Sequence, residues 1–230
     1  MRCLIFLFVF TIFDLTSVCA QISVGPEIGV NGSAYIVTRD GEHTINRLNG
    51  GVRAGIKADI GLTKHFSLQP GVLYVNNADI PSPMAGGSAT SFNVHTIQIP
   101  LSLVYKANAG HVTTPFLGIG PYIGFNAGGK ADIPGSIMPP YISEPGYARP
   151  LKIGSAATDD IKLLDVGVSV TAGLELPNGL YALLLYQKGI ANQQPQGNAS
   201  NAMKDVNFGI SLGCFFHCSK KHEEKKGGLN

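Results

Sequence analysis

A strictly alternating stretch at residues 162–176, KLLDVGVSVTAGLEL, restricts the possible folds of this chain more than any other feature. Every second residue from Leu164 to Leu176 is apolar, and the residues between them are Asp, Gly, Ser, Thr or Glu. A β-strand sends alternate side chains to opposite faces, so the segment is predicted to be a strand with one apolar and one polar face. It is about twice the usual strand length. Because the polar face is mostly short residues and the apolar face has no charge, the pattern is typical of a membrane β-barrel strand with a polar interior.

The same alternation recurs along the chain, so the sequence predicts an all-β fold, an eight-stranded antiparallel transmembrane β-barrel of the outer-membrane type. The predicted strands are residues 21–31, 52–62, 66–76, 94–106, 115–126, 162–176, 180–190 and 206–216. In residues 180–190 three consecutive leucines leave the two faces unassigned. The connections alternate between long and short, as in outer-membrane barrels, and an even strand count places both termini in the periplasm.

Aromatic residues on the apolar faces support this prediction. Residues 66–74 span about 26 Å along a strand, which corresponds to about 20 Å across the membrane when the strand is tilted by about 40°. That distance is close to the height of the apolar band between two aromatic girdles. The six aromatics lie near the short turns (Phe66, Tyr105, Phe216) or near the long loops (Tyr74, Phe125, Phe208).

The amino terminus resembles a secretory signal peptide. Arg2 precedes an apolar run at residues 4–13, which is too short to span a bilayer as a helix. Small residues then predict cleavage between Ala20 and Gln21; an uncleaved anchor and a lipoprotein signal that uses Cys19 are the alternatives. The predicted domains are therefore a signal peptide at 1–20, the barrel at 21–217 and a polar periplasmic tail at 218–230.

Several charged residues fall on the inward faces of the predicted strands. An unpaired charge in a narrow interior is costly, so these groups must pair, form hydrogen bonds or become neutral. We expect Glu27 to pair with Arg53 or Lys57 across two neighbouring strands, and the network to plug a barrel whose interior is just wide enough for side chains. The predicted polar network of the interior is Glu27, Arg53, Lys57, Asp59, Asp165 and Glu175.

A soluble lipocalin-like barrel is the alternative fold, and it would bind an apolar ligand inside. Its polar faces would then point to water, whereas the polar faces here are short and rich in glycine. That composition suits a tight interior better than a solvated exterior.

No catalytic arrangement stands out, and we predict that the protein is not an enzyme and has no cofactor. The alternative is a lipid-modifying outer-membrane enzyme that uses His43 or His95. The net charge of +2 gives no indication of a nucleic-acid partner. A metal site is not predicted either, because the following residues match no standard zinc spacing: Cys214, His217, Cys218 and His222.

The chain resembles the Bacteroidetes outer-membrane β-barrel family that includes PorT-like proteins. The resemblance rests on the order and spacing of FSLQPGVLY (66–74), IQIPLSL (97–103), PFLGIGPY (115–122), DVGVSVTAG (165–173) and GISLGCF (209–215), with Ala20-Gln21 after the signal. It implies the barrel fold and the outer membrane, and PorT itself belongs to a protein-secretion system. The family usually ends at the aromatic of its last strand, whereas HCSKKHEEKKGGLN follows Phe216 here.

Taken together, these observations predict a non-enzymatic scaffold in the outer membrane. Rigid scaffolds carry function on their loops. We therefore expect the external loops to bind a ligand or to serve an envelope or secretion assembly. The expected partners are outer-membrane lipid and an envelope protein, the latter mainly through residues 127–161.

Overall fold

The computed structural model describes residues 22–45, 49–81, 91–107, 113–133, 136–138, 142–144 and 146–217. The predicted signal peptide and tail lie outside these residues, as do Cys218 and His222. The strands are β1 (Ile22–Arg39), β2 (Glu42–Ile45), β3 (Asn49–Gly61), β4 (Phe66–Pro81), β5 (Ser91–Lys106), β6 (Thr114–Ile133), β7 (Ser136–Met138), β8 (Ile142–Glu144), β9 (Tyr147–Pro150), β10 (Leu164–Glu175), β11 (Leu180–Gly189), β12 (Asn201–Cys214) and β13 (Phe216–His217).

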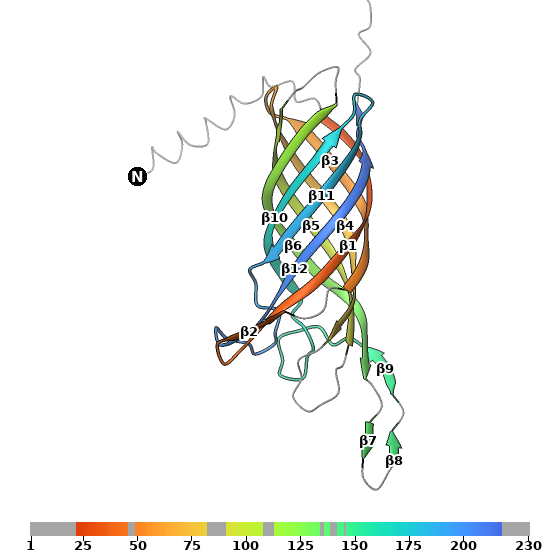
Figure 1. The fold of residues 1–230 in the computed structure, drawn as a ribbon, viewed down its shortest axis with the longest axis vertical. Helices are drawn as coiled ribbons and strands as arrows, with labels where there is room; N and C mark the ends of the chain where they lie inside the picture. Colours follow the sequence, from red (N-terminus) through yellow and green to blue (C-terminus); the bar gives the residue numbers. More distant parts are fainter. Residues whose placement is uncertain are drawn as a thin grey trace, which may run out of the picture.

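Eight of these strands form a closed antiparallel barrel (Figure 1). The order around the barrel is β10-β11-β12-β1-β3-β4-β5-β6, and pairing of β6 with β10 closes it. The predicted fold class is therefore confirmed. The strand ends that are joined through residues 62–65, 107–113 and 176–179 lie at one end of the barrel, here called the turn end, together with the start of β1. The strand ends that are joined through the longer connections 40–48, 82–90, 134–163 and 190–200 lie at the opposite end, here called the loop end.

Four short strands add to the loop end, and one adds to the turn end. β2 folds back on β1, β9 pairs with the end of β6, and β7 pairs with β8 in a separate hairpin. β13 extends the β12 edge against the start of β1. Among the described residues, no helix is long and apolar enough to cross a membrane.

Six barrel strands run further toward the loop end than the alternation predicts, namely β1, β3, β4, β5, β6 and β12. β1 continues to Arg39 rather than ending at residue 31, β6 continues to Ile133 rather than 126, and β12 begins at Asn201 rather than 206. The physical reason is that the interior changes from polar to apolar beyond the membrane. Tyr35 and Met203 point inward there and are buried, so the contrast between a polar inner face and an apolar outer face is lost.

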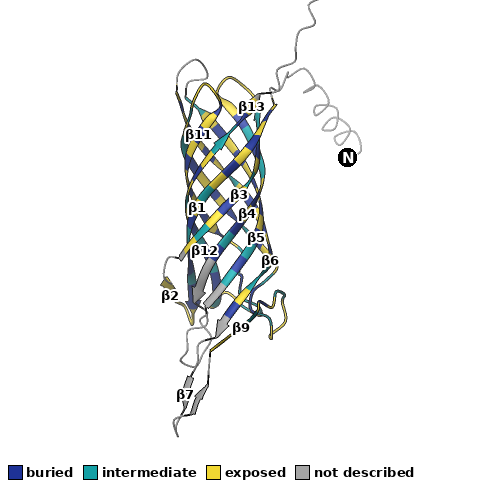
Figure 2. Ribbon diagram, turned by 90° about the vertical axis from the view of Figure 1, so that its right-hand side faces the viewer, coloured by how far each residue is buried: buried dark blue, intermediate teal, exposed yellow. Residues whose placement is uncertain are grey.

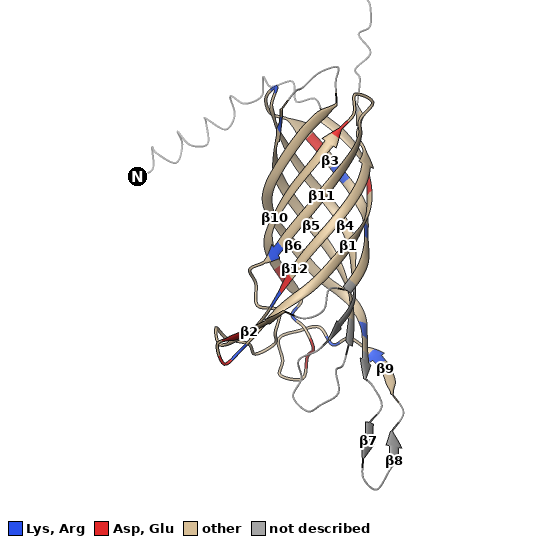
Figure 3. Ribbon diagram, in the orientation of Figure 1, with Lys and Arg blue, Asp and Glu red and all other residues tan. Residues whose placement is uncertain are grey.

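The outer wall of the barrel is an apolar surface. Along each strand, buried and exposed residues alternate (Figure 2). Ile28, Leu117 and Leu212 are 66%, 62% and 60% exposed. Charged residues occupy few positions along the barrel strands (Figure 3). Soluble proteins rarely expose an apolar patch of this extent, so lipid is the solvent that suits this wall.

The run of leucines in β11 separates cleanly onto two faces in the structure. Leu180, Leu184 and Tyr186 are exposed, whereas Leu183 and Leu185 are buried. The inward leucines pack in an apolar cluster inside the barrel with Val104, Phe116, Tyr181 and Phe215. Both faces of β11 are therefore apolar, which is why its sequence alone does not reveal the orientation.

Exposed aromatic side chains lie near both ends of the wall. All six aromatics predicted for the girdles are exposed, between 39% and 63%. The rings of Phe66 and Tyr105 lie 5.3 Å apart at the turn end. At the loop end, Phe208 pairs with Tyr186, and their rings lie 5.1 Å apart. Tyr186 is an additional girdle residue that the sequence did not assign.

Candidate functional site

A buried ion pair network joins β1 and β3 inside the barrel. The carboxylate of Glu27, whose side chain is 0% exposed, lies 2.8 Å from Lys57 Nζ and 3.4 Å from Arg53 Nε. The Tyr181 hydroxyl donates a hydrogen bond of 3.2 Å to Glu27 Oε2 from β11, which lies two strands away from β1 around the barrel. The structure thus brings Glu27 together with both of the basic residues that the sequence offered as alternatives.

The register between β1 and β3 explains why both cations reach one carboxylate. Glu27 stands opposite Gly55, and Arg53 and Lys57 lie two residues to either side of that glycine. Diagonal neighbours across an antiparallel pair lie within reach of long side chains. A Cβ added at Gly55 would approach the Val72 carbonyl oxygen and the Leu73 Cα, so the glycine also allows β4 to approach closely at this layer.

A second ion pair network lies at the turn end. Lys106 Nζ lies 2.9 Å from Asp59 Oδ2 and 2.7 Å from Glu175 Oε2, and Gln69 donates to the other oxygen of Asp59 at 2.8 Å. Asp59 and Glu175 therefore join each other through Lys106 and do not join the network around Glu27. Lys106 is the member that the sequence prediction left out, although it falls on the inward face of a predicted strand.

Two buried carboxylates form a third group near the loop end. The Tyr122 hydroxyl lies 3.1 Å and 3.3 Å from the two oxygens of Asp205, and Asn207 Nδ2 donates to Asp205 Oδ2 at 2.6 Å. Asp165 accepts a hydrogen bond of 2.9 Å from Gln193 Nε2 and also contacts the Tyr122 hydroxyl. Within the described part of the chain, neither carboxylate has a Lys, Arg or His partner. This group of carboxylates therefore differs from the other two groups, in which each carboxylate is paired with a cation.

An apolar cluster closes the lumen at the loop end. Side chains from the extended parts of the barrel strands meet two residues of the loop after β9, and the whole cluster is Tyr35, Val37, Val94, Ala131, Leu151, Ile161 and Met203. Leu151 and Ile161 thus anchor the loop that follows β9 into the barrel. A cavity of about 450 Å³ lined by Asp59, Lys106 and Glu175 opens at the turn end, and inward side chains occupy the lumen between it and this cluster.

An ion pair at the loop end holds the same loop. Arg149 donates two hydrogen bonds to Asp160, of 2.6 Å and 2.7 Å, and the backbone N–H of Lys152 donates a third of 2.8 Å. Burial raises the pKa of Asp160, but the hydrogen bonds from Arg149 and Lys152 lower it by more, so the net pKa lies below its usual range. A lowered pKa stabilises the folded loop above the unfolded value of about 4, and this stabilisation is lost as the pH falls through the folded pKa.

Several polar residues of the interior were not in the predicted network. Lys106 and Tyr122 fall on inward faces, and this signal was available in the sequence. Asp205 lies just before a predicted strand, so its inward direction depends on the extension of β12. Gln193 lies in a predicted loop and reaches Asp165 because the loop folds back over the barrel end. No alternation rule places that residue.

The two histidines of the enzyme alternative lie near the loop end of the outer wall. His43 Nδ1 lies 2.9 Å from Thr38 Oγ1, and His95 contacts the Tyr74 hydroxyl and stacks on its ring. Across the described ranges, neither histidine has a carboxylate partner. In the same part of the chain, no three His, Cys, Asp or Glu side chains are grouped so that they could hold a metal ion.

Comparison with solved structures finds similar outer-membrane proteins. The chain is similar to OprG from Pseudomonas aeruginosa, with a TM-score of 0.47, 12% identity and coverage of 86% of this chain and 97% of that chain. It is similar to Ail, the attachment invasion locus protein of Yersinia pestis, with a TM-score of 0.43, 11% identity and coverage of 85% and 99%. The outer membrane enzyme PagL gives a TM-score of 0.41, 14% identity and coverage of 80% and 98%.

Comparison with protein sequences gives a family. No curated protein matches the chain. The outer membrane protein beta-barrel domain family matches it over residues 18–192, which include seven of the eight barrel strands. Because this match covers well over half of the 230 residues, the chain belongs to the outer membrane protein beta-barrel domain family.

Proposed function

We propose that this outer-membrane barrel is a closed, non-enzymatic scaffold that presents its loop end to a partner at the cell surface. The observation that carries the proposal is the filled interior. Ion pairs around Glu27 and Lys106 occupy the lumen, and an apolar cluster that includes Tyr35 and Ile161 covers its loop end. A barrel filled in this way is suited to holding loops in place rather than to passing solutes.

The external loops are suited to the role because they are fixed to the barrel. The Arg149–Asp160 ion pair and the burial of Leu151 and Ile161 hold residues 146–163 against the barrel end. Asn192 holds the neighbouring loop, since it accepts from Met203 N at 3.0 Å and donates to Asn201 O at 3.2 Å. A preorganised surface loses less conformational entropy when it binds. The partner we propose is an envelope protein, as the resemblance to PorT-like proteins implies.

The proposed orientation places both termini in the periplasm and the loop end outside. It rests on the general arrangement of short periplasmic turns and longer external loops. An epitope inserted at Gln196, in the connection between β11 and β12, is expected to bind antibody on intact cells. The same epitope at Asn178, in the turn between β10 and β11, is expected to bind only after the outer membrane is permeabilised. Labelling of the Asn178 epitope on intact cells would overturn the orientation.

Closure of the barrel predicts the absence of a stable channel. In a planar lipid bilayer, the purified protein is expected to show no steady conductance, because charged and apolar side chains occupy the lumen. A variant with both Leu151→Ser and Ile161→Ser, which weakens the apolar cluster, is expected to conduct intermittently. A large steady conductance of the unmodified protein would contradict the proposed scaffold role and favour transport.

A further inference from the structure

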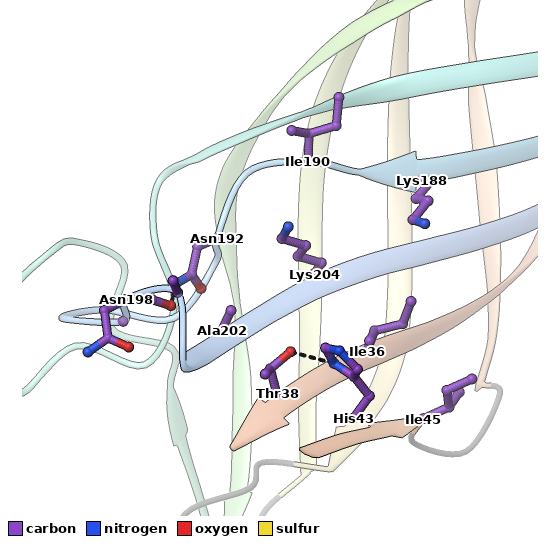
Figure 4. Close-up of a pocket in the computed structure, with 12 residues that line it drawn as sticks. Ile36, Thr38, His43, Ile45, Lys188, Ile190, Asn192, Asn198, Ala202 and Lys204 are labelled. Atoms are coloured by element: carbon purple, nitrogen blue, oxygen red, sulfur yellow. Dashed lines mark hydrogen bonds between the residues drawn. The ribbon is translucent and has the colours of Figure 1, made fainter. Parts of the chain in front are cut away.

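A groove of about 780 Å³ lies on the outside of the barrel wall at the loop end (Figure 4). β1 and β2 form one side, and the other side is formed by the end of β11, the following loop and the start of β12. Its apolar surface comes from Ile36, Ile45 and Ile190, and its charge comes from Lys188 and Lys204. None of the described residues that line the groove is Asp or Glu. It therefore combines an apolar surface with two positive charges.

Hydrogen bonds fix both sides of this groove. β2 pairs with β1, and the contact of 2.9 Å between Thr38 Oγ1 and His43 Nδ1 links their side chains (Figure 4). On the other side, Asn192 in the loop after β11 donates to Asn201 O and accepts from Met203 N, both at the start of β12. The groove is thus formed by the fold before any ligand binds.

The depth of the two lysines follows from the aromatic pair Tyr186 and Phe208. Lys188 lies two residues beyond Tyr186 toward the loop end, and Lys204 lies four residues beyond Phe208 in the same direction. At about 3.3 Å per residue and a tilt of about 40°, Lys188 and Lys204 lie about 5 and 10 Å beyond the girdle in the direction of the loop end. Aromatic girdles mark the membrane interface, so the ammonium groups lie at the level of the lipid headgroups.

A second groove of about 650 Å³ lies on β1, β3, β11 and β12, on the membrane side of the first. Leu184, Phe208 and Ile210 line it, and all three are more than half exposed. Gly32 and Gly50 stand opposite each other on β1 and β3, beside Phe208, and leave the wall hollow at this point. A hollow apolar strip below a cationic groove has the shape and polarity of a lipid with an anionic headgroup.

The two ammonium groups have no partner in the described part of the chain. Neither Lys188 nor Lys204 forms an ion pair there, in contrast to Lys57 and Lys106 inside the barrel. An exposed lysine at a membrane surface is attracted to anionic lipid headgroups. Two lysines on neighbouring strands, both facing the same groove, are placed to bind one anionic group together.

We propose that this groove binds a phosphorylated lipid of the outer leaflet, with its phosphate on Lys188 and Lys204 and an acyl chain along the apolar strip below. The inference rests on the proposed function only for the orientation that turns the loop end outward. It adds a site on the outer wall, separate from the loop surface proposed for the protein partner.

Lipid binding to the purified protein in detergent micelles tests the proposal without reference to orientation. Native mass spectrometry would compare bis-phosphorylated lipid A with its dephosphorylated form as probes. The double variant Lys188→Gln and Lys204→Gln is expected to bind the phosphorylated lipid about thirtyfold more weakly. The double variant Lys64→Gln and Lys152→Gln, which removes the same charge from exposed positions outside the groove, is expected to bind as the parent does.

Three results would overturn the proposal. They are equal binding of the phosphorylated lipid by the Lys188/Lys204 variant and the parent, equal binding of both lipids by the parent, and full displacement of the lipid by millimolar inorganic phosphate. The last would indicate a site for free phosphate. Each would leave the epitope accessibility at Gln196 unaffected, so loss of this inference is distinguishable from loss of the proposed scaffold role.

Discussion

Replacement of Glu27 by Gln is expected to lower the stability of the folded barrel by about 3 to 5 kcal/mol, the range for leaving a buried charge without its partner. The substitution keeps the size of the side chain but removes the negative charge between two buried cations. Lys57 Nζ at 2.8 Å and Arg53 Nε at 3.4 Å would both lose their counter-ion. The measurement is the urea midpoint of the folded band on unboiled gels, with the protein refolded in lipid vesicles.

Two further variants make the result specific to the ion pair. Glu42→Gln changes an exposed carboxylate in β2, and its midpoint is expected to remain close to that of the parent. Combining Glu27→Gln with Lys57→Met removes one of the stranded cations, and part of the lost stability is expected to return. If Glu27→Gln unfolds at the parent's midpoint, the ion pair does not stabilise the barrel.

The barrel itself could be predicted from the sequence because lipid and a crowded lumen impose opposite requirements on adjacent residues. Wherever a strand crosses the membrane, as in residues 164–175, this contrast is visible residue by residue. The inward direction of Glu27, Arg53 and Lys57 follows from the same alternation. The register was not predictable, because a glycine-rich face allows more than one pairing. The position of both bases around one carboxylate follows from Gly55 standing opposite Glu27.

The remaining parts of the interior could not be predicted, because their side chains do not follow that contrast. Tyr35 and Val37 point inward above the membrane, where the interior is apolar, so this part of β1 does not have a polar face. Leu183 and Leu185 also point into an apolar part of the interior, so the sequence of β11 does not show which of its faces is the inward one. Gln193 reaches the interior from a loop. Its contact with Asp165 depends on how that loop packs against the barrel, which the alternating pattern does not predict.

Replacing a carboxylate near the loop end by an amide is expected to raise the stability of the barrel, whereas Glu27→Gln is expected to lower it. Asp205 is 3% exposed and Asp165 is 7% exposed, and within the described residues no cation pairs with either. Both contact the Tyr122 hydroxyl, which carries one hydrogen and can donate it to one carboxylate at a time. A buried charge without compensation is unfavourable for folding, and two that share a donor also repel each other.

Asp205→Asn is therefore expected to stabilise the barrel by about 1 to 3 kcal/mol at neutral pH, because it removes the cost of desolvating a buried charge that no cation compensates. The amide oxygen can still accept from Asn207 Nδ2, and the amide N–H₂ can donate to the Tyr122 hydroxyl oxygen, so no hydrogen-bond partner is stranded. The check is the same urea midpoint, measured beside Glu27→Gln. Both substitutions turn a buried carboxylate into an amide, and they are expected to move the midpoint in opposite directions because only Glu27 lies between cations. A lower midpoint for Asp205→Asn would show that the charge on Asp205 is compensated in the folded protein.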